Sequence, residues 1–279
     1  MRAEYTWNGA REAFPLGSII VASIFPYRDE NETQRTPYVT YALVAINVLA
    51  WLFVQGAGST MALAASVCNL GLIPGELTLS VAPETAMPMG PDLVCYTDQG
   101  RQISNVLTSM FLHGSWMHLI GNMWFFWIFG NNVEDSMGRL RFLGFYLICG
   151  VLAAFSQVAT NPGSNIPMVG ASGAVSGVMG AYLLLFPRVR VFTFVFLGFF
   201  FTTVALPAWV MLIYWMVLQF LGGLQSIGAT GGVASWAHVG GFVAGVVLIK
   251  LFVRPDYLAE HRSHHWRPQR LGLERSRWS

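Results

Sequence analysis

The chain has 279 residues, of which 54% are hydrophobic and only 11% are charged, and its formal net charge is +2. Soluble globular domains contain about 45–50% apolar and about 25% charged residues, so this composition excludes an ordinary soluble protein. It indicates an integral membrane protein.

Six apolar segments approach the ~20 residues that a helix needs to cross a bilayer. These runs are continuous and lack the alternation of lipid-facing and lumen-facing residues that identifies barrel strands. A transmembrane β-barrel is therefore excluded. The sequence therefore predicts an all-α membrane protein, a bundle of six transmembrane helices with a long first outward loop. In chain order, the predicted spans one to six are 38–55, 116–133, 142–160, 169–186, 206–221 and 235–253.

The basic residues predict the orientation of these spans, because cytoplasmic loops of membrane proteins collect Lys and Arg. Basic pairs precede span one and follow spans two, four and six, whereas the loops on the opposite side hold only Arg101. All the pairs fall on one side if both termini are cytoplasmic. The pairs are Arg28 and Arg35, Arg139 and Arg141, Arg188 and Arg190, and Lys250 and Arg254.

The apolar stretch 191–224 is long enough for two spans rather than one. Two spans would place Lys250 and the basic C-terminal end on the outer side, against the charge pattern. We therefore expect 191–203, which is rich in Phe and Thr, to form a membrane-associated strand or an interfacial segment. Pro207 suits the first turn of a helix, so span five should begin at about Leu206.

The two ends of the chain are expected to lie outside the membrane domain. Residues 1–24 have charges, only a short apolar run and no small-residue cleavage site, which predicts a cytoplasmic extension rather than a signal peptide. The six-span domain is expected at 25–254. Residues 255–279 are rich in arginine and predict a solvated basic cytoplasmic tail, which could touch anionic headgroups and carries no specific nucleic-acid motif.

The three cysteines have different surroundings. Cys149 lies within span three, where a thiol is inert filling of the helix interface. Cys68 and Cys95 share the first outward loop, where an oxidising compartment would permit a disulfide. The sequence leaves this pairing open, because it does not show whether the two Cα atoms come within bonding range.

Polar side chains inside a membrane are costly and mark functional sites. No acidic residue occurs between Asp135 and Asp256, so a carboxylate is not available to complete a Ser-His-Asp triad within spans three to six. If Ser172 is a nucleophile, a Ser-His dyad with His238 is the economical arrangement. The polar residues of the spans are Asn47, His118, Asn122, Ser156, Ser172, Ser176, Gln219, Ser235 and His238.

The predicted depths of four of these residues agree. Spans two, four and six run inward from the outer side, and Ser172, His238, His118 and Asn122 all lie in the first residues of their spans. His118 and Asn122 are four residues apart and share one helix face, from which both could donate to a developing oxyanion. Small residues at four-residue intervals, including Ser176 and Gly180 in span four and Gly241 and Gly245 in span six, allow two transmembrane backbones to approach closely.

Other roles for these residues stay open at this point. A serine among glycines can serve helix contact alone, and a membrane histidine can relay protons or bind a metal, although the chain offers few further ligands nearby. We expect Ser176 and Gln219 to fill space or bond to backbone carbonyls. His113 is expected to orient the loop before span two.

Four motifs together resemble the rhomboid intramembrane serine proteases. They are HGSWMHLIGN at 113–122, GxxxExxxG from Gly130 through Glu134 to Gly138, GxSG at 170–173, and AHxxGxxxG from Ala237 to Gly245. They occur in the family's order. The FPYRDEN segment at 25–31 also looks like the start of the domain in bacterial members, whereas the Trp-Arg pair found in the first loop of many rhomboids is absent.

The resemblance implies specific roles and partners. Ser172 would be the nucleophile and His238 the general base, with an oxyanion hole from His118, Asn122 and the backbone N–H of Ser172, while Glu134 would be structural. It implies cleavage of single-span membrane proteins near their outer ends, with small residues around the scissile bond and substrate access between spans two and five. The reaction would pass through an acyl-enzyme and need no cofactor. The expected location is the bacterial inner membrane.

Two other functions are weighed against this one. The first is a catalytically inactive rhomboid-like scaffold that binds transmembrane helices, although such proteins typically lack the serine or the histidine. The second is a transporter or proton-coupled channel that uses His118 and His238. A channel requires a continuous polar path, and the inner halves of spans two, four and six contain almost no polar residues.

Overall fold

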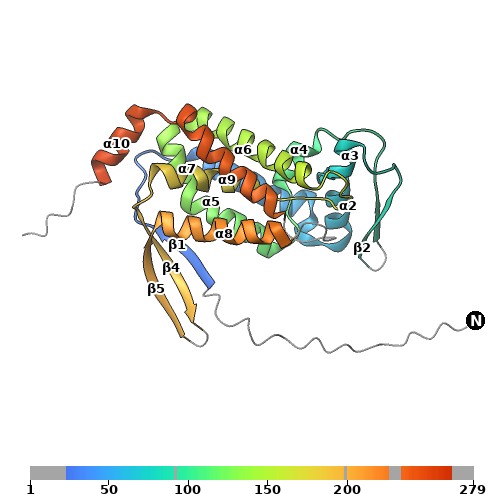
Figure 1. Ribbon diagram of the computed structural model, residues 1–279, viewed down its shortest axis with the longest axis horizontal. Helices are drawn as coiled ribbons and strands as arrows, with labels where there is room; N and C mark the ends of the chain where they lie inside the picture. Colours follow the sequence, from blue (N-terminus) through green and yellow to red (C-terminus); the bar gives the residue numbers. More distant parts are fainter. Residues whose placement is uncertain (1–22, 91–92, 198–199, 226–233, 266–279) are drawn as a thin grey trace, which may run out of the picture.

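A bundle of long helices dominates the computed structural model, which describes residues 23–90, 93–197, 200–225 and 234–265 (Figure 1). Each predicted span contains a helix. The helices are α1 (Tyr38–Leu49), continued by the π-helix η1 (Ala50–Val54), α5 (Trp116–Met137), α6 (Arg139–Thr160), α7 (Ser172–Leu185), α8 (Ala208–Gln225) and α9 (Ser235–Phe252).

Among the described residues, three of these helices are both long and apolar enough to cross a membrane, namely α6, α8 and α9. The helical segments Tyr38–Val54 and Ser172–Leu185 are apolar but shorter. Large apolar side chains also face outward, for example Val247 at 64% and Leu251 at 75% exposure. Such a surface suits lipid rather than water. The protein is therefore an integral membrane protein, and the number of six spans stays a prediction.

Helix α7 lies at the centre of the bundle and meets α9 at backbone distance. A Cβ atom added at Gly241 would overlap the carbonyl oxygen of Gly173, and one added at Gly245 would overlap that of Gly177. Small residues thus allow the close approach that the spacing predicted. Around them, a fully buried aromatic cluster fills the interior between α5, α6 and α7. Its members are Phe126, Phe129, Phe142, Phe145, Tyr146 and Tyr182.

The fold is not all-α, which corrects the predicted class. Strands β1 (Ser23–Asp29), β4 (Arg190–Leu197) and β5 (Phe200–Pro207) form an antiparallel sheet in the order β1-β4-β5, which extends away from the bundle beside α8 (Figure 1). The strand expected at 191–203 is thus confirmed as part of a hairpin. The predicted start of span five was wrong: Pro207 ends β5 and the helix begins at Ala208. A residue that precedes proline favours the extended conformation, which keeps Leu206 in the strand.

The first outward loop folds into its own layer at one end of the bundle (Figure 1). It contains α2 (Thr60–Leu70), α3 (Pro74–Thr78), the paired strands β2 (Ala86–Gly90) and β3 (Leu93–Tyr96), and α4 (Asn105–Thr108). Short 3-10 turns cover Gly56–Gly58 and Ser109–Phe111. A disulfide joins Cys68 in α2 to Cys95 in β3 with a Cα–Cα separation of 5.7 Å, which answers the question that the sequence left open.

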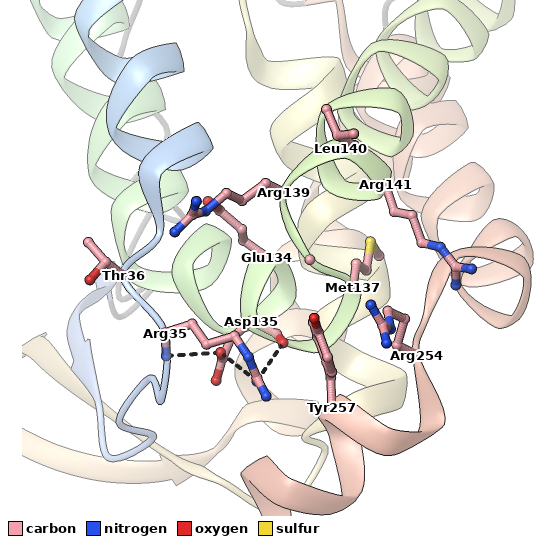
Figure 2. Close-up of a pocket in the computed structure, with 11 residues that line it drawn as sticks. Arg35, Thr36, Glu134, Asp135, Met137, Arg139, Leu140, Arg141, Arg254 and Tyr257 are labelled. Carbon is pink, nitrogen blue, oxygen red and sulfur yellow. Dashed lines mark hydrogen bonds and ion pairs between the residues drawn. The ribbon is translucent and has the colours of Figure 1, made fainter.

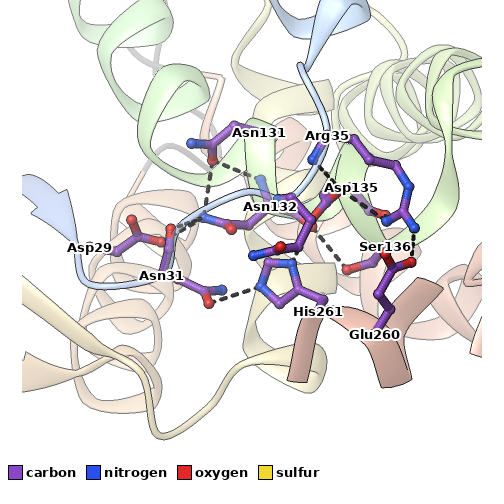
Figure 3. A network of polar contacts seen from close by, with 10 residues as sticks. Asp29, Asn31, Arg35, Asn131, Asn132, Asp135, Ser136, Glu260 and His261 are labelled. Carbon is purple, nitrogen blue, oxygen red and sulfur yellow. Dashed lines mark hydrogen bonds and ion pairs between the residues drawn. The ribbon is translucent and has the colours of Figure 1, made fainter. Parts of the chain in front are cut away.

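At the opposite end of the bundle, residues Pro255–His265 form α10 instead of the solvated tail that we expected. The ring of His261 is 1% exposed and bonds to Asp135 Oδ2 at 2.6 Å and to Asn31 Oδ1 at 2.9 Å (Figure 3). Asp135 also accepts bonds from the backbone N–H and the guanidinium of Arg35. These contacts dock α10 against the end of α5. The rest of the predicted tail, 266–279, and residues 1–22 of the predicted extension lie outside the described residues.

Glu134 orders the same end of the bundle. Its carboxylate accepts hydrogen bonds from the backbone N–H groups of Val39 and Thr40 at 3.0 and 2.8 Å and from Thr40 Oγ1 at 2.8 Å. The first N–H groups of a helix have no partner inside it, so this carboxylate caps α1. The structural role expected for Glu134 therefore has a direct physical basis.

Candidate active site

Ser172 is the first residue of α7, and a glycine in a conformation with positive φ positions it. Gly170 has φ of +136°, a conformation that L side chains rarely adopt, and its N–H donates to the carbonyl of Ser109 at 2.9 Å. A Cβ atom at this position would lie 2.8 Å from His118 Nε2 and 3.4 Å from Ser172 Oγ. Only glycine therefore lets the chain turn into α7 while the imidazole and the hydroxyl border the same space.

The structure brings Ser172 and His238 together. His238 Nε2 lies 2.7 Å from Ser172 Oγ, and the His238 side chain is buried. The two residues come from α7 and α9, whose glycine contact sets the distance between them. A hydroxyl at hydrogen-bond distance from an imidazole is the arrangement that nucleophilic catalysis requires.

Gln219 in α8 holds the other side of the histidine ring. Its Oε1 lies 2.7 Å from His238 Nδ1. An amide oxygen only accepts hydrogen bonds, so with this amide orientation Nδ1 carries the proton, and the neutral ring then presents the lone pair of Nε2 to the Ser172 hydroxyl. One helical turn earlier, the ring of Trp215 lies 5.8 Å from that of His238.

We expected Gln219 to fill space or to bond to a backbone carbonyl, whereas its partner is the imidazole of His238. The available signal was the cost of placing an amide in an apolar span, which by itself does not identify the partner. For Ser176 the expectation was right: its Oγ donates to the carbonyl of Ser172 at 2.5 Å.

His118 lies near the start of α5, where its own backbone N–H donates to the Ser115 side chain at 3.1 Å. The N–H of Gly114 donates to His118 Nδ1 at 3.3 Å, so Nδ1 is an acceptor and Nε2 carries the proton. That Nε2–H group borders the space beside Ser172. A donor in this position suits a developing negative charge.

Asn122 lies one turn further along α5 and is buried. Its Nδ2 donates to the carbonyl of His118 at 3.0 Å, and the structure gives it no hydrogen bond to Ser172 or His238. The amide has two N–H groups, so one is left to donate elsewhere. The predicted oxyanion-hole pair therefore shares one helix face, with His118 at the serine and Asn122 behind it.

His113 supports this arrangement from the loop before α5. Its backbone N–H and carbonyl both bond to the side chain of Gln55, at 2.8 and 2.7 Å, and its ring contacts that of His118 at 5.2 Å between centroids. Burial, followed by the neighbouring His118, lowers the pKa of His113 to about 3. The ring therefore stays neutral, which agrees with the expected loop-orienting role.

Beside Ser172 there is a small cavity of about 20 Å³. Its walls include Ala153, Ala154, Gly150, Gly173 and Ala237. This space is large enough for about one water molecule. The surroundings of Ser172 thus admit only a small group on this side.

Among the residues that the structure describes, no group of three or more His, Cys, Asp or Glu side chains is placed to hold a metal ion.

Comparison with known proteins points to one family. The rhomboid domain matches residues 100–255, which include all four residues of the candidate site. The human mitochondrial presenilin-associated rhomboid-like protein is 35% identical over 91 residues, 31% of this chain and 24% of the relative. Rhomboid-like protease 5 of Toxoplasma gondii is 32% identical over 155 residues, 52% of this chain and 16% of the relative. RHOMBOID-like protein 5 of Arabidopsis thaliana is 30% identical over 154 residues, 54% of this chain and 45% of the relative.

These relatives come from eukaryotes, and the human protein is mitochondrial. The comparisons therefore give no support to the bacterial subtype and the bacterial inner membrane that the N-terminal segment suggested. The chain spans less than half the length of each of these relatives. Because the matched domain covers more than half of the sequence, the chain belongs to the rhomboid family.

Proposed function

We propose that this protein is an intramembrane serine endopeptidase that cleaves single-span membrane proteins near the outer ends of their helices. The observation that carries the proposal is the 2.7 Å contact between Ser172 Oγ and His238 Nε2. The orientation of His238 by Gln219 supports it, because that bond leaves the acceptor nitrogen facing the hydroxyl. The similarity to a rhomboid-like protease is a further argument.

In the proposed first half-reaction, Ser172 Oγ attacks the carbonyl carbon of the scissile peptide while His238 Nε2 takes the hydroxyl proton. The carbonyl oxygen becomes an oxyanion that accepts hydrogen bonds from His118 Nε2–H, from Asn122 and from the backbone N–H of Ser172. The C–N bond then breaks and His238 returns the proton to the leaving amine. An ester between the substrate and Ser172 remains.

In the second half-reaction, a water molecule attacks the ester carbonyl and His238 takes its proton. The same donors stabilise the second oxyanion. When the C–O bond to Ser172 breaks, the proton passes back to the serine and the new carboxyl terminus leaves. Each catalytic group thus ends in its starting state.

We further propose that the site accepts a substrate residue with a small side chain next to the scissile bond. The support is the volume of the cavity beside Ser172, about 20 Å³, whose walls combine alanine and glycine with Met110, Met168 and Val169. A branched or aromatic side chain would have to displace these groups in a closely filled interior.

The proposed catalytic domain covers residues 25–254, with the N- and C-terminal ends of the chain on the arginine-rich side. The support is that the segment just before Ser172 bonds to the first loop, Met168 with Leu72 and Gly170 with Ser109, while α10 lies at the other end of the bundle (Figure 1). The scissile bond would accordingly lie near the outer membrane surface.

The test is cleavage of a tagged single-span reporter by the purified protein, together with labelling by a fluorophosphonate probe. Ser172→Ala should abolish both. Ser176→Ala is the matched control, because Ser176 is on the same helix and its hydroxyl donates to the carbonyl of Ser172 rather than to the ring of His238. Residual cleavage or labelling in Ser172→Ala contradicts the assignment of the nucleophile. A wild-type protein that neither cleaves nor reacts would instead favour the non-catalytic scaffold.

A further inference from the structure

A large cavity of about 540 Å³ opens at the end of the bundle remote from Ser172 (Figure 2). It lies between the start of α1, the junction of α5 and α6, and the start of α10. It is independent of the candidate active site. The residues that line it are Arg35, Thr36, Glu134, Asp135, Met137, Gly138, Arg139, Leu140, Arg141, Arg254 and Tyr257.

The charge of this cavity is mainly positive. Four arginines line it against two carboxylates, and both carboxylates are already engaged. Glu134 caps α1, and Asp135 bonds to His261 and Arg35. Within the described part of the chain, neither Arg139 nor Arg141 forms an ion pair, so their charges are available to a ligand.

Aromatic rings hold three of the four guanidinium groups in place. Tyr257 lies between Arg35 and Arg254 (Figure 2), each 3.8 Å from the ring centroid. Arg139 lies 4.4 Å from the ring centroid of Tyr38. Arg35 also pairs with Asp135 and Glu260, and Arg254 pairs with Asp256, so among the stacked groups it is Arg139 whose N–H donors can face phosphate oxygens.

The rim of the cavity is apolar on the side of α1 and α6. Leu140 is 86% exposed and Tyr38 is 55% exposed, and both lie where the predicted spans one and three begin. Exposed apolar side chains at that level face the lipid, and tyrosines are typical of the membrane interface. A ligand in the cavity would thus have its charge among arginines and an apolar part beside Leu140.

From this combination we propose that the arginine cavity binds the phosphate headgroup of an anionic phospholipid of the surrounding bilayer. Arg139 and Arg141 contact the phosphate oxygens, and the acyl chains run along Leu140 and Tyr38. Because Tyr257 belongs to α10 and Arg254 directly precedes it, the bound lipid also fastens α10 to the bundle. Anionic headgroups attract basic residues at the inner membrane surface in general, whereas this cavity provides a defined pocket for one of them.

The experiment titrates dioleoylphosphatidylglycerol into the purified full-length protein in neutral detergent and counts bound lipid by native mass spectrometry. Dioleoylphosphatidylcholine is the uncharged comparison. The test variant is Arg139→Gln with Arg141→Gln. The matched control is Arg188→Gln with Lys250→Gln, which removes two exposed charges from the same predicted side without touching the cavity.

We expect the wild type and the control to prefer phosphatidylglycerol over phosphatidylcholine. The apparent affinity of the test variant for phosphatidylglycerol should fall roughly tenfold or more, since each basic residue near an anionic surface adds to the binding free energy. Equal losses in the two double variants, or no loss in either, overturn the proposal. Arg139 stacks on Tyr38, so its replacement by Gln could lower lipid binding by disturbing the fold. The variant Arg139→Lys with Arg141→Lys controls for this, because it keeps both charges and should still prefer phosphatidylglycerol. Loss of that preference in the Lys variant also overturns the proposal.

A second arm distinguishes the lipid from a free anion. Inorganic phosphate, added at the concentrations that saturate the protein with phosphatidylglycerol, should neither displace the lipid nor raise the melting temperature. If inorganic phosphate displaces the lipid and raises the melting temperature as much as phosphatidylglycerol does, the cavity is a site for a soluble phosphate and the lipid proposal is wrong.

Discussion

Replacement of Gln219 tests the proposed mechanism most sharply, because this residue acts on the reaction only through His238. Gln219→Met keeps the length of the side chain and removes the acceptor for the Nδ1 proton, which now lies 2.7 Å from Oε1. Nothing then favours the tautomer with the proton on Nδ1. In the alternative tautomer Nε2 carries the proton and does not accept one from Ser172.

The size of the effect follows from the strength of one neutral hydrogen bond. Its net contribution is roughly 0.5–1.5 kcal/mol, which corresponds to about a 2- to 13-fold loss of the active tautomer. A buried Nδ1–H left without a partner costs about 1–3 kcal/mol, which drives the ring further toward the inactive form. We therefore expect kcat to fall about tenfold, with KM unchanged because Gln219 acts through the base.

The assay is steady-state cleavage of a single-span reporter in detergent, with melting temperatures measured in parallel. Gln219→Glu keeps an acceptor at the same reach and should retain clearly more activity than Gln219→Met. Gln225→Met, at the exposed end of the same helix, is the control and should behave as the wild type. If a folded Gln219→Met enzyme keeps its kcat, or if the Glu variant is as impaired as the Met variant, the positioning role is refuted.

Two further predictions concern Asn122 and Asp29. Asn122→Ala removes one proposed oxyanion donor and should lower kcat roughly 10²–10³-fold without abolishing activity; a rate within threefold of the wild type would show that Asn122 does not serve the oxyanion. Burial raises the pKa of Asp29 to about 7, so the folded state keeps a proton that the unfolded state releases above about pH 4. Stability from this group is thus complete below pH 4 and is lost as pH rises to about 7, by roughly 4 kcal/mol at most. Asp29→Asn keeps an oxygen acceptor for Tyr182 and Asn132, and should flatten the decline of the melting temperature over this range relative to the wild type; identical pH profiles would contradict the raised pKa.

The sequence predicted the parts of the structure that depend on local pattern. Apolar runs located the six helices, and small-residue spacing predicted the contact between α7 and α9 that sets Ser172 against His238. The apolar runs and the small-residue spacing are each visible within a single segment, without knowledge of its partner in the fold. The depth of each polar residue in its span, which we inferred from the charge pattern, stays a prediction.

The features that the sequence did not predict depend on partners far away in the chain. His261 is buried because Asp135, 126 residues earlier, and Asn31 bond to its ring, so the polar first part of the predicted tail is a docked helix. Gln219 acquired its role from the ring of His238 on another helix. The β4–β5 hairpin needs β1 as a third strand, which lies more than 150 residues earlier. Such pairings leave no periodic signal in the sequence.

The two contacts of His238 differ in mechanical character. Its distance to Ser172 is set by glycine backbones of α7 and α9 that touch directly, with no side chain between them to change rotamer. The nitrogen that carries its proton is set by Gln219 on α8. Only 22% of the most apolar stretch of α8 is buried inside the protein. The distance between the two side chains thus depends on rigid backbone contacts, whereas the ring's protonated nitrogen depends on a helix that is mostly exposed. Under the proposed mechanism, a displacement of α8 would impair His238 as the base and leave Ser172 in place, without disturbing the contact between α7 and α9.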